Sequence, residues 1–319
     1  YYYKENLSSL ITHIIYAFSL QSLVQIVSFL YPSINIFFNI FRYPNNIEKA
    51  ETYIGGFRGL SISGSAFYGL SVGYGLIIIL FIYNWNCIKI NNIFFKYYLF
   101  FLIILGGIFS ARTSLLGFVI CLIYLFNKII YKYIINLPIL KIKIINKIEI
   151  KNIFILLILF SLFFYFIFIF QKSDSLNSNL NLFNKWAFQF FYNLQSKGTL
   201  TTSSTNVLFS EMYFPIPKGT LLFGDGSYIG SDGSYYMHTD AGYMRNILYF
   251  GITGLIILFI YQFSFFIWKD KKSIIRNIFI IIYISIVHIK GDSFGSNHLM
   301  QNILFLNFLC GYFKKNKFL

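Results

Sequence analysis

The strongest constraint on this chain is a series of long apolar runs separated by short polar segments. The runs cover roughly residues 7–30, 64–83, 97–109, 113–130, 152–170, 246–268, 274–287 and 299–312. Several approach or exceed ~18 residues, the length that spans the ~30 Å hydrocarbon core of a bilayer. Because lipid offers no water to backbone amides, such runs must fold as helices. We therefore predict an all-α, polytopic integral membrane protein, with residues 1–319 forming a single membrane domain of about eight transmembrane helices.

Positive charge is concentrated between the apolar runs. The chain carries a formal net charge of +15, although only 12% of its residues are charged. The Lys-rich segments are 84–96, 127–151, 269–276 and the C-terminal tail. Such segments stay in the cytoplasm by the positive-inside rule, so the charge indicates topology and no nucleic-acid partner is expected. A first loop at 31–63, the link at Arg112, a large loop at 171–245 and the link at 288–298 then lie on the opposite, outer face.

Further expectations concern single residues of the predicted helices. The polar residues of the first run are Thr12, Ser19, Gln21, Ser22 and Gln25. We expect them to face protein instead of lipid, and we interpret His13 as a hydrogen-bonded core histidine. Gly69, Gly73 and Gly75 are spaced for close helix contact. The chain begins with tyrosines and not with Met, so we expect the natural protein to extend beyond this N-terminus.

Arginine is scarce, and most of it falls on the predicted outer face. Five of the 26 basic residues are arginines. Arg58, Arg112 and Arg245 each stand at the end of an apolar run on that face. A guanidinium offers a planar fork that suits phosphate oxygens, so the three together favour a diphosphate-binding site. The alternative is that each one caps a helix or extends towards lipid headgroups.

A glycine-rich polar stretch from Gly219 to Gly254 delivers further ionisable groups to the start of an apolar run. His238 and Asp240 precede Arg245, and either could act as a general base. The alternative is an Asp that caps the helix beside a surface His. Lys290, close to Asp292, is read either as a substrate contact or as part of a local salt bridge.

Other motifs in the chain do not suggest a cofactor. The sequence GDGSYIG lacks the strand and the lysine of a phosphate-binding loop, so we interpret it as a turn-rich loop against the membrane face. Cys87, Cys121 and Cys310 show no metal-binding spacing. We predict neither a metal nor another cofactor.

Four motifs in order resemble the bacterial O-antigen polymerase (Wzy-type) and O-antigen ligase superfamily. RGLSISGSAFYG from Arg58 to Gly69 is similar to the Arg-x10-Gly pattern of the family's first outer loop. SART at 110–113 resembles its SRT turn, and LLFGDG at 221–226 resembles its LFGxG motif. HTDAGYMRNILYFGITG at 238–254 resembles its DxGYxR…GxxG segment. The family's second outer loop often repeats Arg-x10-Gly, but residues 198–219 contain no Arg, so Arg245 is taken as the substitute.

The resemblance implies a fold and an activity. The fold would be GT-C-like with a long periplasmic loop, in the bacterial inner membrane, with the active face periplasmic. The activity would be a metal-independent glycosyltransferase that joins undecaprenyl-diphosphate-linked oligosaccharides into O-antigen or capsule polysaccharide. Arg58, Arg112, Arg245 and Lys290 would bind substrate, and His238 or Asp240 would accept the hydroxyl proton. Membrane lipids and a chain-length regulator protein would be its partners.

Two other functions remain open from the sequence. A ligase of the same superfamily would use the same chemistry with a different acceptor. A polysaccharide flippase or other transporter belongs to a different class, which is expected to show internal repeats and helices broken near the membrane midplane. We recognise no repeat, and the polar groups lie at helix ends.

Overall fold

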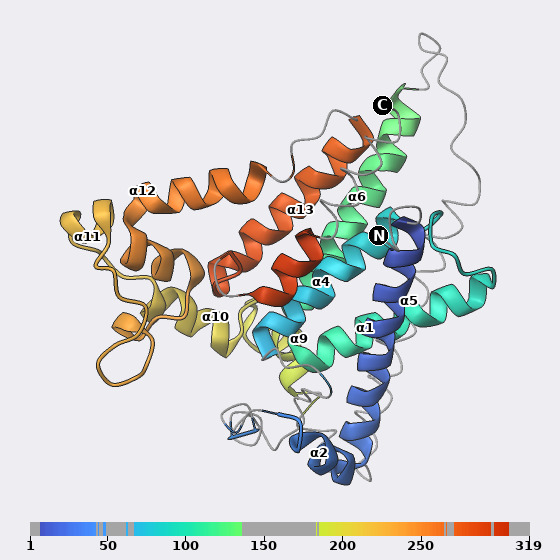
Figure 1. Ribbon diagram of the computed structural model, residues 1–319, viewed down its shortest axis with the longest axis horizontal. Coiled ribbons are helices and arrows are strands. Elements are labelled where there is room, and N and C mark those ends of the chain that lie inside the picture. The colour runs from blue at the N-terminus through green and yellow to red at the C-terminus, as the bar shows by residue number, and fades with distance from the viewer. Residues whose placement is uncertain are drawn as a thin grey trace.

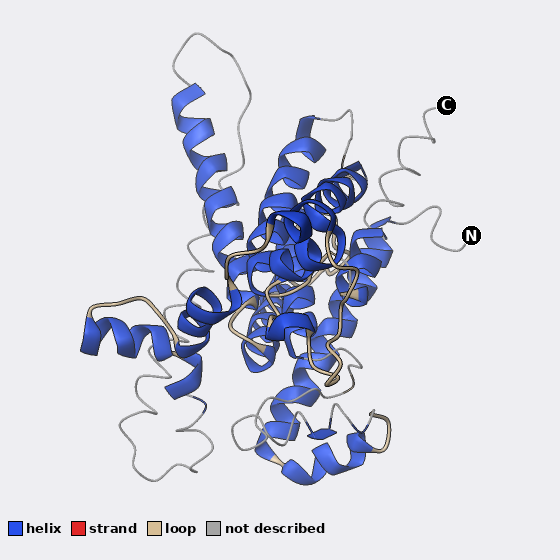
Figure 2. Ribbon diagram, turned by 90° about the vertical axis from the view of Figure 1, so that its left-hand side faces the viewer, coloured by secondary structure: helices blue, strands red, loops and turns tan. Residues whose placement is uncertain are grey.

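The computed structural model is mostly helical in the part of the chain that it describes. It describes residues 7–42, 44, 47–48, 62, 67–135, 183, 185–264, 266, 271–294 and 297–305. Within those ranges there is no strand, only an isolated bridge between Ile229 and Tyr235 (Figure 2). The prediction of an all-α protein is therefore confirmed for these residues.

The helices follow one another in the order shown in Figure 1. They are α1 (Leu7–Leu30), α2 (Pro32–Asn39), α4 (Phe67–Tyr83), α5 (Ile93–Ser110), α6 (Ser114–Ile135), α9 (Gln189–Lys197), α10 (Ser203–Val207), a π-helical turn (Leu208–Met212), α11 (Lys218–Phe223), a 3-10 turn (Tyr236–His238), α12 (Gly242–Ser264) and α13 (Lys271–Lys290). Residues 298–305 are helical as well.

Helix α4 is the centre of the core, and it is buried on every side. It packs against α1, α5, α6 and α13. A helix that is apolar all round requires such a position. Its glycines allow the neighbours to approach: a methyl group at Gly73 would collide with Leu299, and one at Gly75 would collide with the Tyr283 ring. The predicted close contacts at these two glycines are confirmed.

Helix α1 turns its polar side towards the core. Thr12, Ser19, Gln21, Ser22 and Gln25 are all buried. The Gln25 amide donates to Ser110 Oγ at 2.9 Å and accepts from the Tyr74 hydroxyl at 2.9 Å. The expectation that this face contacts protein is confirmed, because buried polar groups need such partners. His13 is exposed, so its interpretation as a core histidine is wrong.

Several predicted boundaries need correction. Residues 31–63 were expected to form a loop, but α2 begins directly after α1. Helix α5 begins at Ile93, so Lys96 lies inside a helix and its Nζ donates to the Trp85 carbonyl at 3.0 Å. The predicted loop at 171–245 contains α9, α10 and α11. The predicted span at 152–170 lies outside the described residues.

Three helical segments in the described part of the chain are long and apolar enough to cross a membrane. They are Ser9–Phe29 in α1, Ile93–Ser110 and Gly242–Ser264. Shorter apolar helices are Phe67–Tyr83, Ser114–Phe126 and Asn277–Lys290. The described part of the chain therefore contains apolar helices that are compatible with a membrane protein.

Candidate functional site

The site is built around a break in α12. At Gly251 the backbone has φ 69° and ψ 177°, a conformation that interrupts the helix and that only glycine adopts readily. Gly224, with φ 74°, lies against it: a methyl group there would meet the backbone of Tyr249 and Gly251. The LLFGDG and FGITG motifs therefore contact each other through their backbones. The glycine-rich loop packs on a helix instead of holding a phosphate.

The loop also supplies the hydrogen bonds that the broken helix loses. The amide of Asp225 donates to the Leu248 carbonyl at 2.7 Å, and the amide of Gly226 donates to the Tyr249 carbonyl at 3.2 Å. Helix ends expose such carbonyls, which must find partners when buried. Thr253 Oγ1 adds a bond to the Leu222 carbonyl at 2.9 Å. This seam fixes residues 242–250 as a separate short helix beside α11, at the left of Figure 1.

Arg245 lies on that short helix between two tyrosine rings. Its guanidinium carbon is 4.4 Å from the Tyr228 ring centroid and 4.1 Å from that of Tyr235. Its Nε is buried and has no hydrogen-bond partner among the described residues. Aromatic rings attract a cation electrostatically without using its N–H donors. The guanidinium is thus held in place while donors remain available for an anion.

Asp240 and Lys290 complete the charged group around Arg245. Desolvation by the surrounding protein raises the pKa of Asp240, and the charges of Lys290 and, more weakly, Arg245 oppose that rise. The Asp240 side chain is nonetheless exposed. Since water reaches the carboxyl, we treat it as ionised at neutral pH, with a greater affinity for a proton than an ordinary aspartate. Asp240, just before α12, therefore lies within electrostatic range of Lys290 and Arg245.

A buried chain of polar side chains runs behind Tyr228. The Tyr228 hydroxyl lies 2.7 Å from Asp292 Oδ2 and 2.9 Å from the Asn246 amide. That amide lies 2.9 Å from His288 Nε2, and the backbone N–H of Ser293 donates to His288 Nδ1 at 3.1 Å. Burial and the Asp292 charge raise the pKa of Tyr228, so its hydroxyl remains a donor. The chain holds Tyr228 against the arginine.

The direction of these bonds follows from the donors and acceptors available. His288 Nδ1 accepts from a backbone amide, so the proton of the neutral ring lies on Nε2. The structure places Asn246 Oδ1 at the Tyr228 hydroxyl and Nδ2 at His288 Nε2. Turning the amide over lets its oxygen accept from Nε2–H and its nitrogen donate to the Tyr228 oxygen, an orientation set by the network. Tyr228 in turn donates to Asp292. Every bond in the chain is satisfied in this orientation.

His238 belongs to a different group from Asp240. It lies on an exposed turn in which Met237 and His238 both have positive φ values, of 54° and 53°. Its Nδ1 is 3.2 Å from Ser234 Oγ, which also bonds the Asp232 carboxylate at 2.8 Å. The Ser234 hydrogen bonds lower the pKa of Asp232. His238 is thus fixed by its own loop and takes no part in the charged group around Arg245.

The three predicted arginines do not share one set of contacts. Arg58 lies outside the described residues. Arg112 donates to the Trp186 carbonyl at 3.1 Å and to Gln189 Oε1 at 3.2 Å, and its guanidinium carbon lies 5.2 Å from the Trp186 ring centroid. Its contacts therefore lie at the start of α9. None of these partners contacts Arg245.

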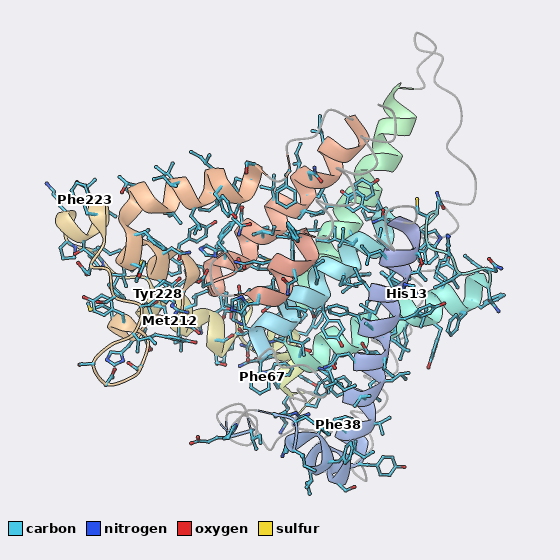
Figure 3. The ribbon with its side chains drawn as sticks, viewed as in Figure 1. His13, Phe38, Phe67, Met212, Phe223 and Tyr228 are labelled. Atoms are coloured by element: carbon cyan, nitrogen blue, oxygen red, sulfur yellow. The ribbon has the colours of Figure 1, made fainter. Side chains whose placement is uncertain are left out.

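A packed segment nevertheless connects the two arginine environments. Gln189 accepts from Ser203 at the start of α10 at 3.3 Å. The π-helical turn that follows places Leu208 in a small apolar cluster with Ala241 and Met244. Thr239 Oγ1 donates to the Met212 carbonyl at 2.9 Å. Figure 3 labels Met212 and Tyr228, both at the left of the view.

Sequence reasoning missed the residues that position Arg245. Tyr228, Tyr235, Asn246 and His288 were not singled out. The tyrosines lie in the polar GSYIGSDGSYY stretch, where aromatic residues close to a lone arginine were an available signal. Asn246 and His288 lie 42 positions apart, so no local pattern relates them.

Comparison with known protein families, curated proteins and solved structures finds no match to this chain. The fold is that of a helical protein with apolar helices long enough to span a membrane. Its site combines a broken helix with an aspartate that feels the charges of a lysine and an arginine.

Proposed function

We propose that this protein is a polysaccharide polymerase that joins oligosaccharide repeat units carried on undecaprenyl diphosphate. The observation that supports this most is the Arg245 guanidinium, flanked by Tyr228 and Tyr235 and with its Nε unpartnered among the described residues. A fixed cation with available donors suits the diphosphate of a departing lipid carrier. No metal is needed in this scheme, because the guanidinium stabilises the charge that develops.

The proposed reaction is a glycosyl transfer between two lipid-linked chains. A sugar hydroxyl of one unit attacks the anomeric carbon of the other, and a new C–O bond forms. The bond from that carbon to the diphosphate oxygen breaks, and the bonding pair leaves with the diphosphate. Asp240 accepts the hydroxyl proton, while Arg245 and Lys290 hold the leaving group. We favour Asp240 over His238 because Asp240 lies in the electrostatic range of both cations.

The membrane arrangement belongs to the same proposal. About eight spans in a GT-C-like fold would put the Lys-rich segments in the cytoplasm and the charged group on the periplasmic face of the inner membrane. The polymerase would then meet its lipid-linked substrates, and a chain-length regulator, on that side. Arg58 would contribute to substrate binding elsewhere on the same face, whereas Arg112 bonds Trp186 and Gln189 and would support the fold.

The break in α12 gives one reason to consider a transporter as the second candidate. Broken helices in transporters leave backbone groups that bind substrate or ions. Here the carbonyls of Leu248 and Tyr249 already accept hydrogen bonds from the loop amides of Asp225 and Gly226. They are therefore less available to a transported ion, which favours the enzyme. A ligase would use the same charged group with another acceptor.

The test compares two carboxylates of the same region in a deletion strain. Asp240→Asn should abolish the polysaccharide ladder on gels, because loss of a general base costs about a hundredfold or more. Asp225→Asn is the matched control, since Asp225 is exposed and bonds Thr220 and Tyr236 in the glycine-rich loop. Protein level is measured in each strain.

Each alternative gives a different result in the same strains. Lipid-linked units trapped inside the cell would indicate the flippase. A ladder of normal length that is not attached to its acceptor would indicate the ligase. A normal ladder in the Asp240→Asn strain, together with loss in a His238→Ala strain, would overturn the assignment of the base.

A further inference from the structure

One side of α1 is apolar and exposed along most of its length. Its exposed large apolar residues are Tyr16, Leu20, Leu23 and Val27, followed by Tyr31 just after the helix, with 37–62% of each residue accessible. Their spacing of three or four positions places them on one face of the helix. The exposed His13 lies on the same face, nearer the start of the helix. The opposite face carries the buried polar residues that contact α4 and α5. Because α1 is long and apolar enough to cross a membrane, its exposed stripe is the lipid-facing side.

Helix α2 exposes an even larger apolar face. The apolar residues of this face are Ile36 and Phe37 in the helix and Ile40 and Phe41 in the turn that follows it, with 57–76% of each residue accessible. They fall at positions i, i+1, i+4 and i+5, so they form one patch. Phe38 and Asn39, on the other side of the helix, are half-buried. Four adjacent large apolar side chains at this exposure mark a surface that is covered in use.

The two exposed surfaces are continuous because no linker separates the helices. Helix α1 ends at Leu30, and α2 begins at Pro32, which fits the first turn of a helix. The Tyr31 amide still donates to the Val27 carbonyl at 2.8 Å. The apolar patch on α2 therefore begins where the lipid-facing stripe of α1 ends, at the lower end of α1 in Figure 1. Figure 3 labels Phe38 there, on α2.

We propose that α2 is an interfacial helix whose occupant is the lipid leaflet in which α1 ends. Its patch would contact the upper acyl chains, about 5–10 Å into the boundary with the headgroups. The polar end of the segment fits this position. Arg42 Nη1 donates to Asn39 Oδ1 at 2.7 Å there, and these two residues would lie beside the headgroups. The proposal does not depend on the polymerase activity. Helix α2 would be a membrane-surface anchor inside the segment 31–63, which was predicted to be a loop.

The test uses the full-length protein in vesicles of phosphatidylethanolamine and phosphatidylglycerol. Two photoactivatable phospholipids are compared, one with its diazirine near the glycerol and one with it at the end of an acyl chain. Adducts are mapped by mass spectrometry. We expect the shallow probe to label residues 36–41 and the deep probe to label Leu20. Ile78, which is fully buried in α4, should be labelled by neither.

A pair of variants with the same added charge sharpens the test. Phe41→Asp places a carboxylate on the exposed patch and should reduce shallow labelling of residues 36–40 several-fold. Asn39→Asp places it on the half-buried side and keeps an acceptor for Arg42, so labelling should not change. The proposal fails if neither probe labels residues 36–41 while α1 is labelled. It also fails if cross-linking joins this patch to a second copy of the chain.

Discussion

Arg112 and Arg245 occupy two contrasting environments in one molecule. Arg112 uses its donors within the protein, on the Trp186 carbonyl and on Gln189 Oε1. Arg245 is held by two tyrosine rings, and its Nε finds no partner in the described ranges. Both are arginines near helix ends, and both were expected to bind a diphosphate. The contrast shows that what surrounds a guanidinium decides whether its donors serve the fold or a ligand.

The contrast also predicts that loss of each arginine affects a different property, folding for Arg112 and ligand binding for Arg245. Hydrogen bonds from Arg112 stabilise the junction between the α5–α6 link and α9, so its loss should affect folding. Ring contacts stabilise Arg245 only weakly, and a buried N–H without a partner costs free energy. A buried donor without a partner calls for an explanation, and a bound ligand is one. Variants of the two arginines test this difference.

The largest effect is expected on polymer yield in Arg245→Lys. A lysine keeps the charge but loses the planar fork, so transition-state stabilisation should fall by ~3 kcal/mol, about a hundredfold in rate. Arg112→Lys should lower the yield less than about tenfold, because its donors already bond protein. Polysaccharide gels at matched protein levels measure both. Equal yields in the two variants would remove the distinction between the arginines.

Much of the helical core could be predicted from hydrophobic pattern alone. The predicted run at 7–30 coincides with α1 because Pro32 follows it and stops the helix. The start of α5 was misplaced because Lys96 was read as a loop residue. Its long stem allows a buried position with Nζ bonded to carbonyls, and Asn92 caps the helix by accepting from Phe94 and Phe95. Short helices such as α2 fall below the length at which the pattern is decisive.

The candidate site was predicted in part. Asp240, Arg245 and Lys290 were identified by charge in an apolar chain, and the two cations both act on the pKa of Asp240. The helix break at Gly251 could not be predicted, because Gly73, Gly75 and Gly251 look alike in sequence. The first two stay helical and admit neighbouring side chains, whereas Gly251 breaks its helix against Gly224. That choice depends on loop amides distant in sequence, and the positions of Tyr228 and Asn246 follow from it.

The second prediction reverses the order of the two arginines in a stability measurement. Arg112→Met leaves the Trp186 carbonyl and Gln189 Oε1 without their donor, which should cost about 1–3 kcal/mol of unfolding free energy. Arg245→Met removes ring contacts worth only about 0.5–1 kcal/mol. Thermal unfolding in detergent should therefore place the Arg112→Met midpoint lower. If Arg245→Met unfolds first, the ring contacts are structural.

The third prediction concerns the chain behind Tyr228. Tyr228→Phe keeps the ring against Arg245 but removes the donor to Asp292. The activation free energy should rise by ~1 kcal/mol, so activity should fall about fivefold. Tyr236→Phe is the matched control, since its hydroxyl donates to the exposed Asp225. It should leave the ladder unchanged. Full activity in Tyr228→Phe would show that the ring alone positions the arginine.

The smallest effect is a shift in the pH dependence of the reconstituted enzyme. The reaction needs Asp240 as a carboxylate, and crowding raises the pKa of this group. Activity should therefore be complete at higher pH and be lost as pH falls through that raised pKa, earlier than for an ordinary aspartate. Lys290 and Arg245 both oppose the rise, Lys290 more strongly. Removing either positive charge should thus raise the pKa further.

The variants Lys290→Gln, Arg245→Gln and Arg112→Gln turn this into a ranking. Each is measured relative to its own plateau at high pH, so that a lower rate does not obscure the titration. The acid limb should move to higher pH most in Lys290→Gln, less in Arg245→Gln and not at all in Arg112→Gln, because only the first two charges act on Asp240. An equal shift in all three would mean that the limb reports net charge and not Asp240. An unmoved limb in Lys290→Gln and Arg245→Gln would mean that another group is the base, since their charges could then be removed without altering its affinity for a proton.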